Sequence, residues 1–144
     1  MNAPGHIPLS QDAALVLALA GTAMLFSCSV EDQAERWLRA LRLHGQVGTA
    51  MQALGVSEAP LMTGSEPVPE DPGAGPPAGE AVDLVACRAA ELARLRRGRS
   101  VCTIDVFFAL LEVYGRRMDR ALYIRGTSRE ELIERLPGGV EAGC

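Results

Sequence analysis

The chain has 144 residues, of which 48% are hydrophobic, and a formal net charge of -4. This length suits one domain, or two small halves that share a core. All fourteen basic residues are arginines, and without lysine the chain lacks the phosphate-binding lysine of a P-loop, a Schiff-base lysine and the lysine of a Ser-x-x-Lys acylase. We therefore expect no ATPase activity and no bound nucleotide.

The cysteines and histidines are few and widely spaced. They are Cys28, Cys87, Cys102, Cys144, His6 and His44. None of them forms a Cys-x-x-Cys pair, and this spacing favours neither a metal site nor any other cofactor. We expect reduced cysteines, which favour a cytoplasmic location.

The first predicted helix covers residues 11–26, with Ser10 as its N-cap. The run from residue 13 to residue 26 carries no charge, but it is too short to span a bilayer and has no basic flank, so we expect a buried helix and no membrane segment. Its apolar residues recur at helical spacing. They are Leu15, Leu19, Thr22 or Ala23, and Phe26, with Val16 and Leu17 broadening the stripe.

A second helix is predicted over residues 31–43, because Ala34, Trp37, Leu38 and Leu41 share one face. Trp37 is more simply a core residue than a platform for a ligand. A short helix follows over residues 47–54. Residues 57–79 then contain six prolines and four glycines without one basic residue, a composition typical of a flexible acidic linker.

The second half begins with a predicted helix over residues 80–97, which ends at a glycine. The next stretch, residues 103–114, is apolar almost all round and must therefore be buried. Thr103 is its expected N-cap, and Asp105 places negative charge in the first turn. Two short helices follow, over residues 116–124 and 129–136, and residues 137–144 form a frayed tail.

The two halves share an order of elements: a long Ala/Leu helix, a polar break, a central helix, a glycine and a short helix. We therefore predict an all-α fold of two pseudo-twofold-related, four-helix-like repeats, the first one shortened. The repeats cover residues 9–56 and 80–136 and are joined by the Pro/Gly-rich acidic linker, residues 57–79.

Particular residues of both halves carry a resemblance to a known family. They are Ala34–Leu41, His44–Gly45 and Ala53–Val56 in the first half, and Thr103–Leu111, Tyr114–Gly115 and Tyr123–Gly126 in the second. On these residues the chain resembles the N-terminal double-repeat domain of the Clp (Hsp100) chaperone ATPases, the Clp N or Clp R domain. Here the domain is expected to stand alone, without ATPase modules.

The resemblance also implies a binding site. In some relatives a glutamate near the start of the central helix helps to receive a cationic or phosphorylated arginine side chain. Glu35 keeps that position, Ile104 replaces it in the second half, and Asp105 stands where the family has a histidine. We expect a peptide- or adaptor-binding groove between the halves, lined by Glu35, Thr103 and Asp105. The alternative is that both acids only cap their helices.

The predicted function is therefore that of a non-catalytic protein-binding module, which docks substrates or adaptors of a Clp chaperone-protease. A second possibility is an accessory subunit that binds the Clp ATPase or peptidase and modulates its assembly. An enzyme is not expected, because Ser27, Cys28, Ser29 and His44 lie close in sequence without a third orienting group.

Nucleic-acid binding is the remaining alternative, and it rests on arginines of the second half. They are Arg94, Arg96, Arg97, Arg99, Arg116, Arg117, Arg120 and Arg125. A solvated helical face is the commoner role of such arginines, and the acidic net charge of the chain opposes binding to phosphates. Proteins and peptides are thus the expected partners.

Overall fold

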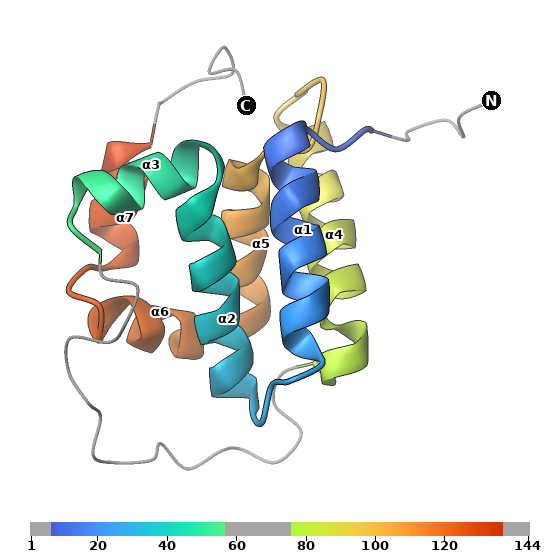
Figure 1. Ribbon diagram of the computed structural model, residues 1–144. Helices are drawn as coiled ribbons and strands as arrows, with labels where there is room; N and C mark the ends of the chain where they lie inside the picture. Colours follow the sequence, from blue (N-terminus) through green and yellow to red (C-terminus); the bar gives the residue numbers. More distant parts are fainter. Residues whose placement is uncertain (1–6, 57–75, 137–144) are drawn as a thin grey trace.

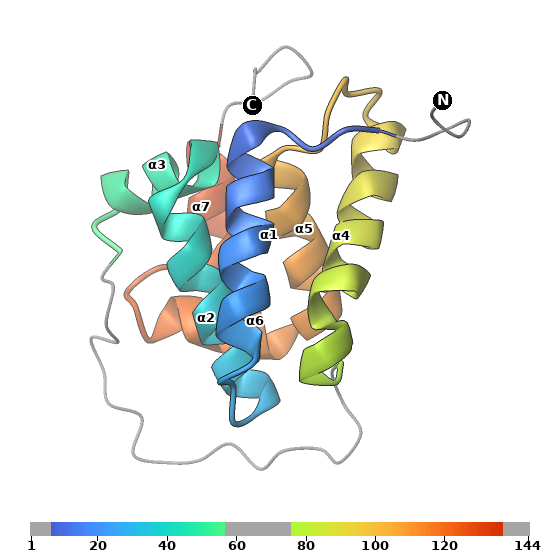
Figure 2. The same ribbon diagram turned by 45° about the vertical axis from the view of Figure 1, so that its right-hand side comes forward.

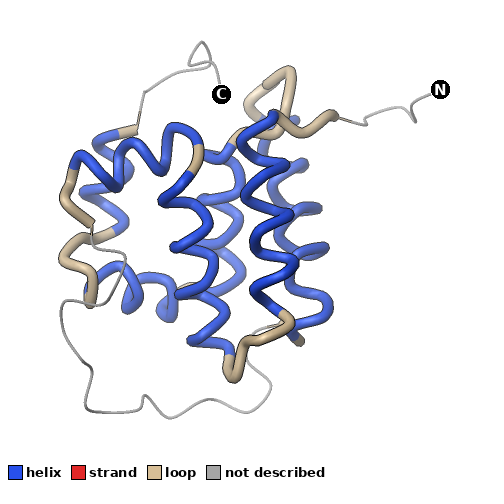
Figure 3. Tube along the Cα trace, viewed as in Figure 1, coloured by secondary structure: helices blue, strands red, loops and turns tan. Residues whose placement is uncertain are grey.

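The computed structural model describes residues 7–56 and 76–136, and this part of the chain is all-α, as predicted, with seven helices and no strand (Figures 1 and 3). The helices are α1 (Gln11–Met24), α2 (Val30–Leu43), α3 (Gly45–Ala53), α4 (Ala78–Leu95), α5 (Thr103–Tyr114), α6 (Arg116–Tyr123) and α7 (Arg129–Arg135). Their bounds agree with the predicted ones to within two residues. A pseudo-twofold relation between the halves stays a prediction.

Four long helices stand side by side as two antiparallel pairs, α1 with α2 and α4 with α5 (Figures 1 and 2). The short helices close one side of this layer: α6 packs against α2 and α5, and α3 packs against α5 and α7. A single parallel β-bridge between Leu9 and Val101 ties the segment before α1 to the segment before α5. Both pairs therefore belong to one packed body.

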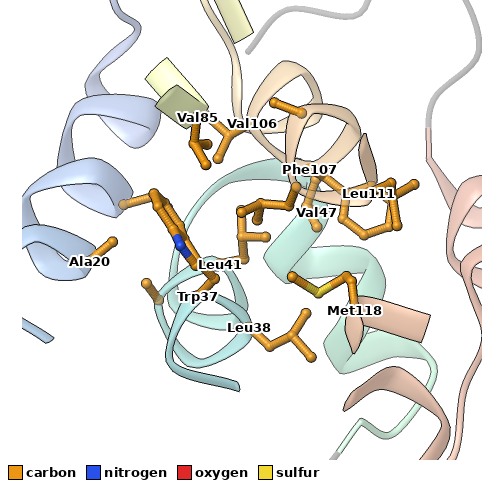
Figure 4. Close-up of a cluster of buried hydrophobic side chains, with 14 of the residues drawn as sticks. Ala20, Trp37, Leu38, Leu41, Val47, Val85, Val106, Phe107, Leu111 and Met118 are labelled. Carbon is orange, nitrogen blue, oxygen red and sulfur yellow. The ribbon is translucent and has the colours of Figure 1, made fainter. Parts of the chain in front are cut away.

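The core is centred on α5, as its composition predicts. Eight of its residues are buried, and Phe107 lies among side chains from α2, α3 and α6 (Figure 4). The predicted inner face of α2 is confirmed as well, since Ala34, Trp37, Leu38 and Leu41 are all buried. Gly115 ends α5 with a φ of 54°, a backbone conformation that glycine adopts at little cost.

The predicted inner face of α1 is wrong in part: Val16 and Leu17, which were expected to broaden it, are buried, but its main positions are not. Leu15, Leu19 and Phe26 are exposed, with 40%, 41% and 67% of their surface accessible. The residues of α1 that enter the core are Ala13, Val16, Leu17, Ala20 and Met24. Because α1 is apolar all round, hydrophobic periodicity cannot select a face, and the alanines let the helix approach α2 and α4 closely.

A buried chain of hydrogen bonds joins the two pairs. The indole Nε1 of Trp37 in α2 donates to the hydroxyl of Tyr114 in α5 at 3.0 Å, and this hydroxyl donates to Oε1 of Gln33 at 2.7 Å. Nε2 of Gln33 donates in turn to the carbonyl of Pro76, just before α4, at 3.1 Å. Burial raises the pKa of Tyr114 to about 12. Each polar group in this series of hydrogen bonds thereby has a partner inside the core.

Most of the predicted linker, residues 57–75, and the predicted tail, residues 137–144, lie outside the described residues. The last residues assigned to the linker belong to ordered structure instead, because α4 begins at Ala78. Within residues 7–56 and 76–136, no helix combines the length and the apolar character that a bilayer crossing requires.

The cysteines differ from one another. Cys28 and Cys87 are free and exposed, whereas Cys102 is disulfide-bonded. The expectation of reduced cysteines is therefore wrong for Cys102, and the cysteines no longer favour a cytoplasmic location.

Candidate protein-binding surface

Asp105, one of the three predicted binding residues, already has hydrogen-bond partners within the chain. Its carboxylate accepts two hydrogen bonds from Arg96, at 2.8 and 2.6 Å, and a third from the backbone N–H of Cys102 at 2.8 Å. The carboxylate is almost fully buried, and these hydrogen bonds raise the pKa of Arg96. Asp105 therefore acts as a capping residue of α5, which is the alternative that the sequence left open.

Thr103 is the first residue of α5 and not its N-cap, which is Cys102. The threonine is buried against the start of α3: a Cβ placed on Gly45 would lie only 2.5 Å from its Oγ1. Thr103 misses the cap position because the capping carboxylate of Asp105 bonds one residue earlier, to Cys102. The contact with Gly45 fills the space between the starts of α3 and α5.

Glu35 lies in the middle of α2 and faces the end of α6. Its carboxylate lies 3.6 Å from Nη2 of Arg125, a buried arginine whose Nη1 donates to the carbonyl of Ala121 at 3.2 Å. Burial lowers the pKa of Arg125, while the charge of Glu35 opposes this shift. Glu35 and Asp105 thus belong to two separate ion pairs, and their role in binding a peptide stays a prediction.

The described residues form a different surface that sequence reasoning missed, a groove between α1 and α2. The α1–α2 groove is a hollow of about 180 Å³, lined by Leu19, Ala23, Arg36, Arg39, Ala40 and Leu43. Its two leucines are exposed, Leu43 with 54% of its surface accessible. Exposed leucines on both walls of a hollow are typical of a site that binds another protein.

The groove continues along an outer stripe that consists of Leu15 and Leu19 on α1 and Phe26 in the turn just after the helix. In the turned view α1 stands at the front of the molecule, and no described element covers its outer side (Figure 2). The stripe carries no charge, since Asp12 is the only charged residue of α1. A largely apolar surface therefore runs from the groove along about two turns of α1.

Arginines supply the charge at the groove wall. Arg36 is paired with Asp32 at 3.0 Å and also donates to the carbonyl of Phe26 at 3.2 Å. Arg39 is exposed, and within the described part of the chain no carboxylate lies at ion-pair distance from it. The groove thus combines apolar walls with one guanidinium group whose charge is not compensated.

The corresponding hollow between α4 and α5 has a different character. The α4–α5 groove measures about 470 Å³ and is lined by Leu84, Cys87, Arg88, Glu91, Glu112 and Val113. Arg88 crosses it, donating to both carboxylate oxygens of Glu112 and, at 2.8 Å, to Glu91. These hydrogen bonds lower the pKa of Glu112. The arginine of this groove is therefore paired within the chain, and the two carboxylates leave the groove with one net negative charge.

A third hollow, of about 500 Å³, lies where α3 meets the start of α1 and the end of α7. It is lined by Asp12, Gly45, Gln46, Thr49, Ala50, Ala53 and Arg135. Its ionisable groups have opposite charges and stand on different helices. No side chain that lines this hollow is a nucleophile with a base beside it. The hollow therefore gives no sign of catalysis and could form only weak polar contacts with a ligand.

Two arginines of the nucleic-acid alternative are unavailable to phosphate. Arg96 is held by Asp105, and Arg125 is buried beside Glu35. In the part of the chain that the structure describes, no three Cys, His, Asp or Glu side chains gather into a possible metal site. Comparison of the chain with family models, with curated proteins and with solved structures finds no match.

One signal in the sequence pointed to the groove. The charge-free run from residue 13 to residue 26 is longer than one buried helix face can use, so part of it had to face outward. The position of Leu43 beside Leu19 could not be predicted, because it depends on the packing of α2 against α1.

Proposed function

We propose that the chain is a non-catalytic protein-binding module that uses the α1–α2 groove and the outer stripe of α1 as its docking surface. The observation that carries this proposal is the exposure of Leu15 and Leu19 on α1, and of Phe26 in the turn after it, on a helix whose only charged residue is Asp12 in its first turn. Exposed apolar surface costs solubility and adds nothing to folding stability, so a partner that covers it is the simplest reason for its presence.

The resemblance to the Clp N-terminal domain supplies the class of partner. A module of this kind would dock substrates or adaptors of a Clp chaperone-protease without binding nucleotide. The helix order is compatible with a pseudo-twofold pair of repeats, with three helices in residues 9–56 and four in residues 78–136. The second candidate is an accessory subunit that binds the Clp ATPase or peptidase itself and modulates its assembly.

A pull-down with matched variants tests the docking surface. Leu19→Glu places a charge in the groove, and Leu84→Glu makes the same change at a comparably exposed leucine of α4. Immobilised wild-type chain and both variants are compared in native lysate by quantitative proteomics. Proteins lost with Leu19→Glu but retained with Leu84→Glu support the proposal, and capture that is identical for all three chains overturns it.

The identity of the captured proteins separates the two candidates. Diverse client proteins or adaptors favour the docking module, whereas a set dominated by ATPase or peptidase subunits favours the accessory subunit. Both candidates share the same groove, so the Leu19→Glu comparison applies to either.

A further inference from the structure

We propose that the α1–α2 groove takes an acidic amphipathic helix of a partner protein, with its apolar face on the leucines and a carboxylate on Arg39. This inference rests on the proposed function, because it names the partner of the same surface. It is carried by the combination of an apolar hollow and an arginine without a partner among the described residues.

The apolar part of the surface has the length and spacing of a helix-binding groove. From Leu15 to Ala23 the helical part of the surface extends for eight residues, or about 12 Å along the axis of α1, and Phe26 follows in the turn after the helix. Leu43 stands on the opposite wall of the hollow from Leu19. A partner helix that projects apolar residues at i, i+3 or i+4, and i+7 can place them along such a stripe within two to three turns.

The charged residues of the surface favour a partner with negative charge. Arg36 and Arg39 both lie on the α2 wall, and Asp32 compensates only Arg36. The α1 wall has no charged residue after Asp12. A carboxylate on the rim of the bound helix would thus find a guanidinium group and no acid among the residues that line the hollow, whereas a lysine there would meet like charge.

The same charges oppose the other occupants. A second copy that docked through the same groove would bring two more arginines and no carboxylate from its lining, so Arg39 would stay unpaired and electrostatics disfavours self-association through the groove. An anionic membrane would also satisfy the charge, but a lipid surface is contacted by a convex apolar face, and the leucines here line a hollow. A helical segment fits both the shape and the charge.

A peptide library tests the inference even with the partner unidentified. A display library of random peptides, about four helical turns in length, is selected against the purified wild-type chain and against Arg39→Glu. For the wild type we expect enriched sequences with apolar residues at helical spacing and an excess of Asp and Glu. For Arg39→Glu we expect the excess to change to Lys and Arg. Arg88→Glu, an exposed arginine in the other groove, is the control and should give the wild-type result.

One enriched peptide, labelled with a fluorophore, then measures the contribution of the charge. Arg39→Gln should weaken its binding about twofold to fivefold at low salt, the range for one exposed ion pair. The difference should shrink as salt is raised. Leu19→Glu should abolish binding, and Leu84→Glu should leave it unchanged.

Several outcomes would overturn the inference. In the library selection, they are a lack of enriched peptides, enrichment without an acidic excess, and an acidic excess that Arg39→Glu leaves unchanged. In separate measurements, they are dimerisation of the wild type that Leu19→Glu removes, and binding to anionic phospholipid vesicles that depends on Leu19. If one of these results is found while capture from lysate still depends on Leu19, the groove remains a protein-docking surface and only the acidic helix is wrong. If capture does not depend on Leu19 either, both proposals fail.

Discussion

The α1–α2 pair and the α4–α5 pair are built alike, but the charged and apolar residues on their outer surfaces are arranged differently. Each is an antiparallel pair of long helices with a hollow on its solvent side. In the α4–α5 groove, Arg88 is paired with both Glu112 and Glu91, so its guanidinium group is satisfied within the chain, while one negative charge and the exposed Leu84 remain. In the α1–α2 groove, exposed leucines and Arg39 have no such complement among the described residues. This difference favours the α1–α2 groove over the α4–α5 groove as the surface that binds another molecule.

The largest effect is expected in the core that both pairs share. Phe107→Ala should lower the free energy of unfolding by about 3 to 5 kcal/mol, because it empties volume at the centre of α5. Phe108→Ala removes the same atoms from a half-buried neighbour and should cost less. Urea midpoints measured by circular dichroism compare the two, and equal midpoints would show that α5 is not the common core.

The contact between α3 and α5 comes next. Gly45 and Gly55 both have positive φ, 76° and 74°, so alanine at either position costs about 1 to 2 kcal/mol of backbone strain. A Cβ at Gly45 would also collide with Thr103, whereas nothing lies within 4 Å of one at Gly55. Gly45→Ala should therefore destabilise more than Gly55→Ala in thermal unfolding. Equal losses would mean that Thr103 moves aside freely.

The hydrogen bonds that join the pairs have a smaller effect. Tyr114→Phe leaves the indole N–H of Trp37 and the amide oxygen of Gln33 without their buried partner, at a cost of about 1 to 3 kcal/mol. Trp37 fluorescence follows the unfolding, since this is the only tryptophan. A neutral effect of Tyr114→Phe would indicate that water replaces the hydroxyl.

The same tyrosine gives a pH dependence. Burial raises the pKa of Tyr114 from 10.0 to about 12, so the folded state holds the phenolic proton more tightly than the unfolded chain does. Its contribution to stability is complete below pH 10 and is lost as the pH rises through about 12. Tyr114→Phe should flatten the stability profile in this window. Identical slopes in the two proteins would contradict the assignment.

The smallest effects on stability are expected at the two grooves, and they sharpen the comparison most. Leu19→Glu should change the free energy of unfolding by no more than about 0.5 kcal/mol, because the side chain is already exposed. Arg88→Gln removes an exposed ion-pair network and should cause a small, salt-sensitive loss. A large loss for Leu19→Glu would show that the outer stripe serves folding and would remove the case for a partner.

Much of the fold could be predicted from the sequence because it depends on interactions between residues that are close in the chain. Glycines, caps and the spacing of apolar residues act within a few residues, so the helices and their bounds, the burial of α5 and the inner face of α2 all follow from them. The absence of lysine likewise limits the chemistry through composition alone.

Only the tertiary structure decided the parts that depend on contacts between distant residues. The inner face of α1 is fixed by its packing on α2 and α4, since an apolar helix has no preferred face of its own. Asp105 and Glu35 are neutralised by Arg96 and Arg125, and those distances exist only in the folded chain. The α1–α2 groove arises in the same way, because a surface between two helices is defined by how they pack.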